Sequence, residues 1–140
     1  MVPVNVLVKY LSQYTSWCFL NLGLHQDTVT LFSLLVILMG STLFIAGYPL
    51  AGAVAYLLFA LLDSTDGDMA RSTKPTSYGG TLDSFGADLF YATSGVSVGY
   101  YLFIQSVSIG ALSPEHILLI GGFTSLTFLF YRLVNAKMYL

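Results

Sequence analysis

Residues 50–71 read LAGAVAYLLFALLDSTDGDMAR, an apolar run that continues directly into three aspartates and an arginine. The part from Leu50 to Leu62 contains no charged residue. Carboxylates at membrane depth are costly and are usually retained for function. The stretch therefore predicts an apolar helix that carries a functional group at its end.

The composition of the whole chain agrees with an apolar solvent. Of 140 residues, 56% are hydrophobic and 9% are charged, whereas a soluble domain has about 25% charged residues. The mean hydropathy is +0.77. A soluble core of this size could not bury so much apolar surface, which predicts an integral membrane protein. The chain has no basic patch that would indicate nucleic acid, and its single cysteine excludes an internal disulfide.

The apolar runs predict an all-α, polytopic membrane helical bundle that forms a single domain over residues 1–140. About 20 apolar residues cross a bilayer, and the expected four spans are about 28–47, 49–71, 79–107 and 115–134. Asp27 is expected to cap the first span, and Pro49 to interrupt the chain before the second. Aromatic residues on one face of residues 1–26 predict an interfacial helix before the spans.

The positive charges predict the orientation. With four spans, all five fall on one side of the membrane; they are Lys9, Arg71, Lys74, Arg132 and Lys137. By the positive-inside rule this side is cytoplasmic. We therefore expect a multi-pass protein whose N-terminus and aspartate-rich segment face the cytoplasm.

Five of the seven acidic residues lie between positions 63 and 88. Asp63 and Asp66 are three residues apart and share one face of a helix. Gly67 and Ala70 lie on the same face, where small residues let a ligand approach the backbone. Arg71 follows, and a guanidinium suits a pair of phosphate oxygens.

Carboxylates gathered in this way repel one another unless a cation lies between them. Oxygen ligands favour Mg²⁺, Mn²⁺ or Ca²⁺, and there is no Cys/His set for zinc. Two such ions could bridge a pyrophosphate. The pattern thus predicts a metal-binding cluster that handles a phosphate-bearing substrate, with Asp68 as a solvated charge outside it.

The segment Asp63-Ser-Thr-Asp66-Gly67-Asp-Met-Ala70-Arg71 resembles the signature of the CDP-alcohol phosphotransferases, also called CDP-alcohol phosphatidyltransferases. That signature is D-x2-D-G-x2-A-R-x8-G-x3-D-x3-D, and its first half matches here at every fixed position. The segment 27–30 is similar to the polar entry of the family's first helix.

The second half of the signature departs from the pattern. In strict register its glycine is Gly80, and Ser84 and Asp88 follow. Alternatively, Gly79 and Asp83 fit the G-x3-D element after a loop one residue shorter, and Asp88 comes one residue late. Our interpretation takes Asp83 as the third carboxylate and Asp88 as the fourth.

The spacing of Asp83 and Asp88 matters for their geometry. A separation of five residues turns one side chain about 140° from the other around an α-helix. The family geometry instead requires that the two carboxylates lie on the same face of the helix. A π-bulge near Gly86 would restore it.

The resemblance implies the roles of the residues. One or two ions, Mg²⁺ or Mn²⁺, would be held by Asp63, Asp66, Asp83 and Asp88. The cytidine nucleotide would be bound by Asp63, Asp66, Gly67, Ala70, Arg71, Gly79 and Gly80. Asp88 would be the catalytic base, and Lys74 and Arg132 would bind the phosphate of the acceptor or of a lipid.

The implied reaction transfers a substituted phosphate group from a CDP-activated alcohol or lipid to an acceptor alcohol. CMP is released, and the product belongs to phospholipid biosynthesis in the membrane. The sequence does not identify the acceptor.

Other interpretations stay open. Family members typically have six transmembrane helices, so a chain with four is a fragment or a shortened relative. The altered spacing also fits a catalytically impaired, family-like membrane subunit, and D-x2-D also occurs in Mg²⁺-dependent membrane prenyltransferases. Gly95-x3-Gly99 predicts close helix packing and a homodimer face, and Gly121-Gly122 predicts close packing too.

Overall fold

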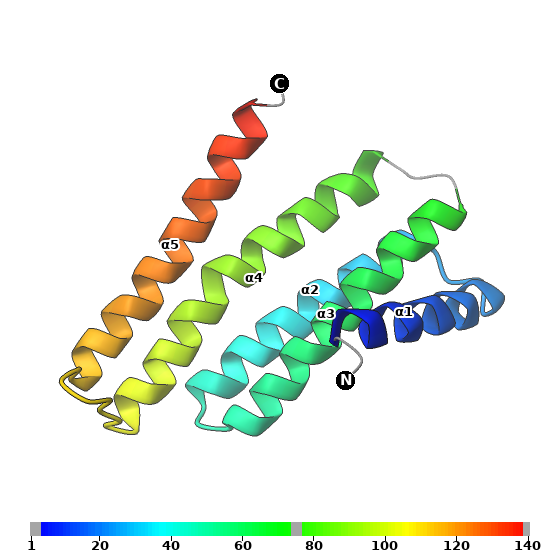
Figure 1. Cartoon of the computed structure of the whole chain (residues 1–140). Coiled ribbons are helices and arrows are strands. Elements are labelled where there is room, and N and C mark those ends of the chain that lie inside the picture. Colours follow the sequence, from blue (N-terminus) through cyan, green and yellow to red (C-terminus); the bar gives the residue numbers. More distant parts are fainter. Residues whose placement is uncertain (1–3, 74–76, 139–140) are drawn as a thin grey trace. The chain divides into compact units, whose positions relative to one another are not determined.

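The computed structural model describes residues 4–73 and 77–138, which form five α-helices and no β-strand (Figure 1). They are α1 (Val4–Asn21), α2 (Gln26–Ile45), α3 (Pro49–Ser72), α4 (Ser77–Ile104) and α5 (Pro114–Met138). The all-α prediction is confirmed. The four predicted spans correspond to α2–α5, and the expected N-terminal helix is α1. Whether α1 lies at a membrane interface stays a prediction.

Three of these helices are long and apolar enough to cross a membrane. The segments are Gln26–Ile45, Pro49–Ser72 and Pro114–Asn135. Within the described parts of the chain, α4 is not among them. Its apolar residues alternate with hydroxyl-bearing residues and glycines between Thr93 and Gly99, which lowers its hydropathy. The count of four spans therefore stays a prediction.

The helix ends follow local chemistry. Gly47 ends α2 with φ at +88°, which glycine adopts without strain, and Tyr48 N–H donates to the Leu43 carbonyl (2.9 Å) in a Schellman-type turn. Pro49 then begins α3. The first residue of a helix has no intrahelical partner for its N–H, so proline, which lacks this N–H, fits there.

The expectation that Asp27 caps α2 is wrong. The helix begins one residue earlier, and His25 occupies the capping position. Its Nδ1 accepts a hydrogen bond from the backbone N–H of Asp27 (3.3 Å).

The described helices divide into two compact units. The first comprises Met1–Ile37 and Ala55–Gly86, and the second comprises Leu38–Val54 and Ala87–Leu140. Consequently α2, α3 and α4 each contribute one part to each unit. We describe the two units separately.

The first unit has an interior that is partly polar. Its buried apolar residues are Val29, Leu34, Ile37, Ala55, Phe59 and Met69. Its buried polar residues are Ser12, Ser16, Gln26, Thr30, Ser33, Thr65, Asp66 and Asp68. Several hydroxyls bond to the preceding turn of their own helix, as Thr30 does to the Gln26 carbonyl (3.2 Å). Between helices, the hydroxyls of Thr15 of α1 and Thr65 of α3 form a hydrogen bond of 2.7 Å, and interhelical hydrogen bonds of this kind are typical of helix packing in lipid.

In the second unit, α4 and α5 pack through glycines and run side by side (Figure 1). A Cβ atom at Gly95 would lie 2.5 Å from the Gly121 carbonyl oxygen, and one at Gly99 would lie 3.4 Å from the Gly121 Cα atom. The predicted close packing of Gly95, Gly99 and Gly121 is confirmed. Since Gly95 and Gly99 make this contact within the chain, the homodimer stays a prediction without support from this motif. Gly122 lies away from the contact.

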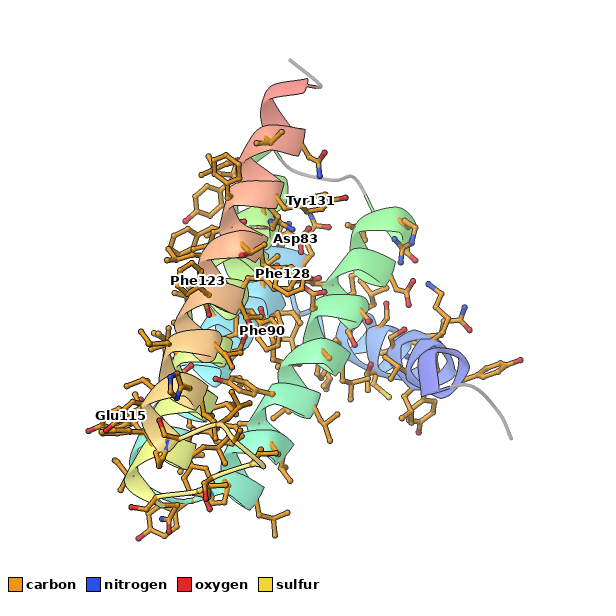
Figure 2. All side chains as sticks on the ribbon, turned by 60° about the vertical axis from the view of Figure 1, so that its left-hand side comes forward. Asp83, Phe90, Glu115, Phe123, Phe128 and Tyr131 are labelled. Carbon is orange, nitrogen blue, oxygen red and sulfur yellow. The ribbon has the colours of Figure 1, made fainter. Side chains whose placement is uncertain are left out.

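Aromatic rings fill the same interface near the end of α5. Tyr91 of α4 stacks on Phe128 of α5 with ring centroids 5.0 Å apart. Phe90 meets Tyr91 edge to face at 5.7 Å, and Figure 2 labels Phe90 and Phe128 on their helices. Such pairs add about 0.5–1.5 kcal/mol each beyond the area they bury.

No π-bulge, which would have brought Asp83 and Asp88 onto one face, occurs near Gly86. The segment from Ser77 to Ile104 is regular α-helix throughout, so Asp83 and Asp88 keep their rotation of about 140°.

The glycine contact gives a direct test of packing in the second unit. Replacing Gly121 by alanine places a Cβ against the backbone carbonyl of Gly95, which cannot move aside as a side chain could. We expect Gly121→Ala to lower stability by about 1–3 kcal/mol. Thermal unfolding in detergent measures this, with Gly122→Ala as the matched control, because a Cβ there meets nothing within 4 Å. Equal shifts in both variants would contradict the packing.

Candidate functional site

Three aspartates from two helices meet in the first unit. Asp63 and Asp66 are one turn apart near the end of α3. Asp83, which Figure 2 labels, lies in the first half of α4. Each offers a carboxylate oxygen, and the three oxygens lie within 4.8 Å of one another. The expected sharing of one helical face by Asp63 and Asp66 thus brings both to a third aspartate. We call these three residues the aspartate cluster.

Asp66 lies at the buried centre of the aspartate cluster. It is 4% exposed, and it lines a cavity together with Thr30 of α2. Its Oδ2 atom is buried and has no hydrogen-bond partner among the described residues. A buried carboxylate oxygen without a partner is costly, so this atom indicates that a ligand belongs beside it.

A cavity of about 110 Å³ opens onto the cluster. Its lining consists of Gln26, Thr30, Asp66, Gly67, Ala70, Gly79, Gly80 and Asp83. Four of these residues are glycine or alanine, which leave the backbone of both α3 and α4 accessible. The structure therefore brings together the small residues that the sequence assigned to nucleotide binding.

The donor set fits a divalent cation. Two ionised carboxylates about 4 Å apart repel by about 4 kcal/mol at an effective dielectric constant of 20. A cation among the three oxygens converts this repulsion into attraction. Hard oxygen donors are the ligands of Mg²⁺ and Mn²⁺, and the unpartnered Oδ2 of Asp66 supplies a buried donor atom.

Arg71 lies at the rim of the cavity. Its guanidinium group would be 3.7 Å from a Cβ atom placed on Gly67, and Gly67 lines the cavity. The Arg71 side chain is 65% exposed and donates to Asp68 Oδ1 (2.5 Å). This position suits the expected contact with a phosphate oxygen.

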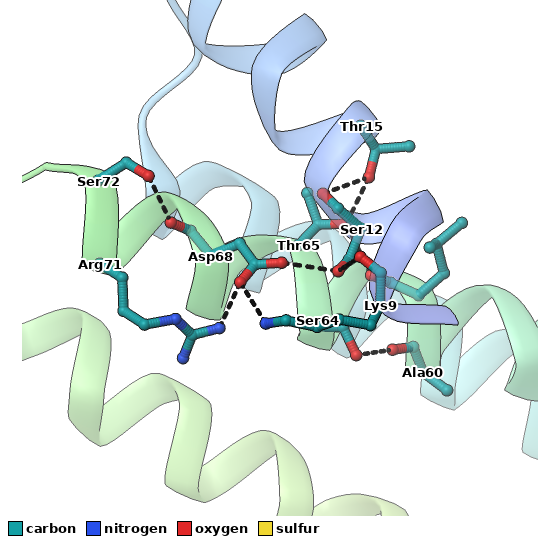
Figure 3. Close-up of polar contacts among 10 residues, drawn as sticks. Lys9, Ser12, Thr15, Ala60, Ser64, Thr65, Asp68, Arg71 and Ser72 are labelled. Atoms are coloured by element: carbon teal, nitrogen blue, oxygen red, sulfur yellow. Dashed lines mark hydrogen bonds and ion pairs between the residues drawn. The ribbon is translucent and has the colours of Figure 1, made fainter. Parts of the chain in front are cut away.

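The interpretation of Asp68 as a solvated charge is wrong. Asp68 is 9% exposed and accepts hydrogen bonds from Lys9, Ser12 and Arg71 (Figure 3). Its position on α3 points away from the face of Asp63 and Asp66, as expected. That direction leads to α1 instead of water, which no periodicity within α3 could reveal.

Asp88 belongs to the second unit, where it forms an ion pair with Arg132 of α5. The Arg132 guanidinium also lies 5.9 Å from the centroid of the Tyr91 ring, within the range of a cation–π contact. Sequence reasoning missed this pairing, because it assigned Asp88 and Arg132 to separate tasks. Lys74, the other residue assigned to phosphate binding, lies outside the described residues.

Gln26 and Thr30 are site residues that sequence reasoning missed. Both are buried, and both line the cavity. Their spacing of four residues on α2 was the available signal, because it places two polar side chains on one helical face. The Gln26 side chain also accepts a hydrogen bond from Thr73, the residue directly after α3 (3.4 Å).

Comparison with known proteins identifies the family. Residues 25–137 match the family model described as CDP-alcohol phosphatidyltransferase. No curated protein and no solved structure matches the chain. The matched segment contains the aspartate cluster, the cavity lining and the Asp88–Arg132 pair. The general activity of this family is phosphatidyl transfer from a CDP-alcohol to an acceptor alcohol in a membrane. The chain belongs to the CDP-alcohol phosphatidyltransferase family.

Proposed function

We propose that this protein transfers a substituted phosphate group from a CDP-activated alcohol or lipid to an acceptor alcohol and releases CMP, as a step of phospholipid biosynthesis. The observation that carries the proposal is the aspartate cluster at the cavity. Its three oxygens lie within 4.8 Å, and the buried Asp66 Oδ2 has no partner among the described residues. A cluster of this kind suits a substrate that brings a metal-bound diphosphate.

In this proposal, Asp63, Asp66 and Asp83 would hold one or two Mg²⁺ or Mn²⁺ ions, and the assignment of Asp88 as a further ligand stays a prediction of the family resemblance. When bound, such an ion neutralises the charge that develops on the phosphate oxygens during transfer. The aspartates keep the diphosphate at a defined place on α3 and α4. Thr30 of α2 lines the same cavity as Asp66 and Asp83.

The size of the cavity suggests which part of the substrate it holds. Small-molecule sites typically measure about 300–1,000 Å³, whereas this cavity measures about 110 Å³. It therefore suits the diphosphate and its ions, and the cytidine lies further out. Gly67, Ala70, Gly79 and Gly80 let the nucleotide approach the backbone, and Arg71 binds a phosphate oxygen at the rim.

Asp88 is the proposed base of the transfer step. Asp88 removes the proton of the acceptor hydroxyl, and the alkoxide oxygen bonds to the phosphorus distal to cytidine. The bond from that phosphorus to the bridging oxygen breaks, and CMP leaves with the bridging oxygen. Arg132 contacts Oδ1 of Asp88 and so orients the carboxylate. Arg132 and Lys74 keep the role that the family resemblance implies, binding the phosphate of the acceptor or of a lipid.

The membrane arrangement is part of the proposal. We propose a single membrane domain over residues 1–140 in which α2 to α5 cross the membrane and the N-terminus and the site face the cytoplasm. We also propose that α1 lies in the interface. Three aromatic side chains of α1 support this, since Tyr10, Tyr14 and Trp17 are 69%, 66% and 63% exposed. Tyr and Trp favour the headgroup region, where their rings meet lipid and their polar atoms meet water.

The first prediction of this proposal concerns Asp66. We expect Asp66→Asn to abolish metal-dependent CMP release, because it removes the buried anionic donor at the centre of the cluster. The assay uses purified protein, Mg²⁺ or Mn²⁺, a CDP-activated lipid and a panel of acceptors that includes inositol phosphate, glycerol phosphate and serine. Glu115→Gln is the control, since Glu115 lies at the start of α5 outside the site. Activity near that of wild type in Asp66→Asn would refute the metal role.

A second prediction decides between Asp83 and Ser84 as the third position of the signature. The carboxylate of Asp83 belongs to the aspartate cluster. We expect Asp83→Asn to weaken Mn²⁺ binding at least tenfold, whereas Ser84→Ala leaves it close to wild type. Titration of Mn²⁺ followed by electron paramagnetic resonance measures both. The reverse order of the two variants would favour the strict register.

A third prediction concerns Asp88. General base catalysis contributes about 10²–10⁴-fold, so we expect Asp88→Asn to lower kcat by at least about 10² while the affinity for the CDP-activated lipid changes little. Steady-state kinetics of CMP release and equilibrium binding measure the two quantities. A kcat equal to that of wild type would exclude Asp88 as the base.

The catalytically impaired subunit is a second candidate, and two observations favour it. Asp88 is paired with Arg132, and the helix between Asp83 and Asp88 is regular. Binding of metal and CDP-activated lipid without CMP release in the same assay would establish it. Release of pyrophosphate from a prenyl substrate would instead indicate a prenyltransferase.

A further inference from the structure

Helix α1 is attached to α3 by polar contacts that converge on Asp68 (Figure 3). Lys9 Nζ donates to Asp68 Oδ1 (2.7 Å), and Ser12 Oγ donates to Asp68 Oδ2 (2.6 Å). One turn further along α1, the hydroxyls of Thr15 and Thr65 form a hydrogen bond of 2.7 Å. Ser12 and Thr65 are fully buried, so these contacts define where α1 lies against α3.

The same carboxylate also holds Arg71. Asp68 Oδ1 accepts from both Lys9 and Arg71. Only one Arg71 nitrogen donates in this contact, and the side chain is 65% exposed. A guanidinium has five N–H donors, so the group retains donors for a phosphate while Asp68 limits its freedom beside Gly67 and the cavity.

The charges of the three residues give Lys9 a specific role. Asp68 and Arg71 alone would form a neutral pair, and a phosphate at the rim would meet little attraction. Lys9 adds a second positive charge to the same carboxylate oxygen. The group of Lys9, Asp68 and Arg71 therefore carries a net charge of +1 beside the cavity.

We propose that Lys9 and Asp68 are positioning residues for the CDP-activated substrate: Asp68 holds Arg71 at the cavity rim, and Lys9 offsets the charge of Asp68 so that Arg71 attracts the substrate phosphates. This inference rests on the proposed function. It assigns a role to α1, which precedes the segment that the family model matches, residues 25–137.

The test compares Lys9→Gln with Ser12→Ala. Both variants remove one contact between α1 and Asp68, but only Lys9→Gln removes a charge. Equilibrium binding of a CDP-activated diacylglycerol in detergent micelles with Mn²⁺ gives Kd, and thermal unfolding reports the stability of each variant. CMP release is measured separately.

We expect Lys9→Gln to raise Kd roughly three- to fivefold at low salt, in line with the modest strength of half-exposed ion pairs. The difference from wild type should shrink as salt increases, since mobile ions screen exposed charges. Ser12→Ala should lower stability without a salt-dependent change in Kd, and Lys9→Arg should restore the Kd of wild type.

A double-mutant cycle isolates the coupling. In an Asp68→Asn background there is no carboxylate charge for Lys9 to offset, so Lys9→Gln should change Kd less than it does in wild type. Equal Kd values for wild type and Lys9→Gln, or equal effects of Lys9→Gln and Ser12→Ala at every salt concentration, overturn the inference. Substrate binding without CMP release refutes the proposed turnover and leaves the inference standing, whereas wild type that binds no CDP-activated lipid refutes both.

Discussion

Repulsion between carboxylates is the constraint on which the rest of the first unit depends. Three aspartates from α3 and α4 bring their oxygens within 4.8 Å of one another, and the central one is buried with an unpartnered oxygen. Without a cation this arrangement is unfavourable by several kcal/mol. A divalent cation among the three oxygens would remove that cost, and this is the physical reason for the proposed metal site.

The packing around the cluster follows from the need to hold polar groups in an apolar chain. Hydroxyl groups of α1, α2 and α3 occupy the interior of the first unit, and several bond within their own helix. In the second unit, close approach of glycines brings α4 against α5. Both solutions suit helices in lipid, where association depends on close packing and hydrogen bonds because there is no hydrophobic drive between helices.

The Lys9–Asp68–Arg71 group and the Asp88–Arg132 pair show how the few charges of this chain are used. Every one of these side chains has an ionic partner in the structure. In each group the arginine holds a carboxylate, and in the proposed function the same arginine also binds a phosphate. Charged residues in such a chain are therefore better understood as groups than as single ligands.

Some features were predictable because they depend on periodicity within one helix. The apolar runs predicted the helices, and the three-residue spacing of Asp63 and Asp66 placed both on one face next to Gly67. The spacing of small residues predicted the close packing at Gly95 and Gly121. These features need only the geometry of an α-helix, and the family signature in residues 63–71 is of the same local kind.

Other features were decided by the tertiary structure alone. Lys9 meets Asp68 across 59 residues of sequence, and Arg132 meets Asp88 across 44. The pairing of side chains from two helices depends on the crossing angle and the register of those helices. Neither quantity can be derived from the periodicity of one helix. The sequence by itself therefore determined the helices and half of the site, whereas the packing of helix on helix decided how Asp83 completes the aspartate cluster and what surrounds Asp68.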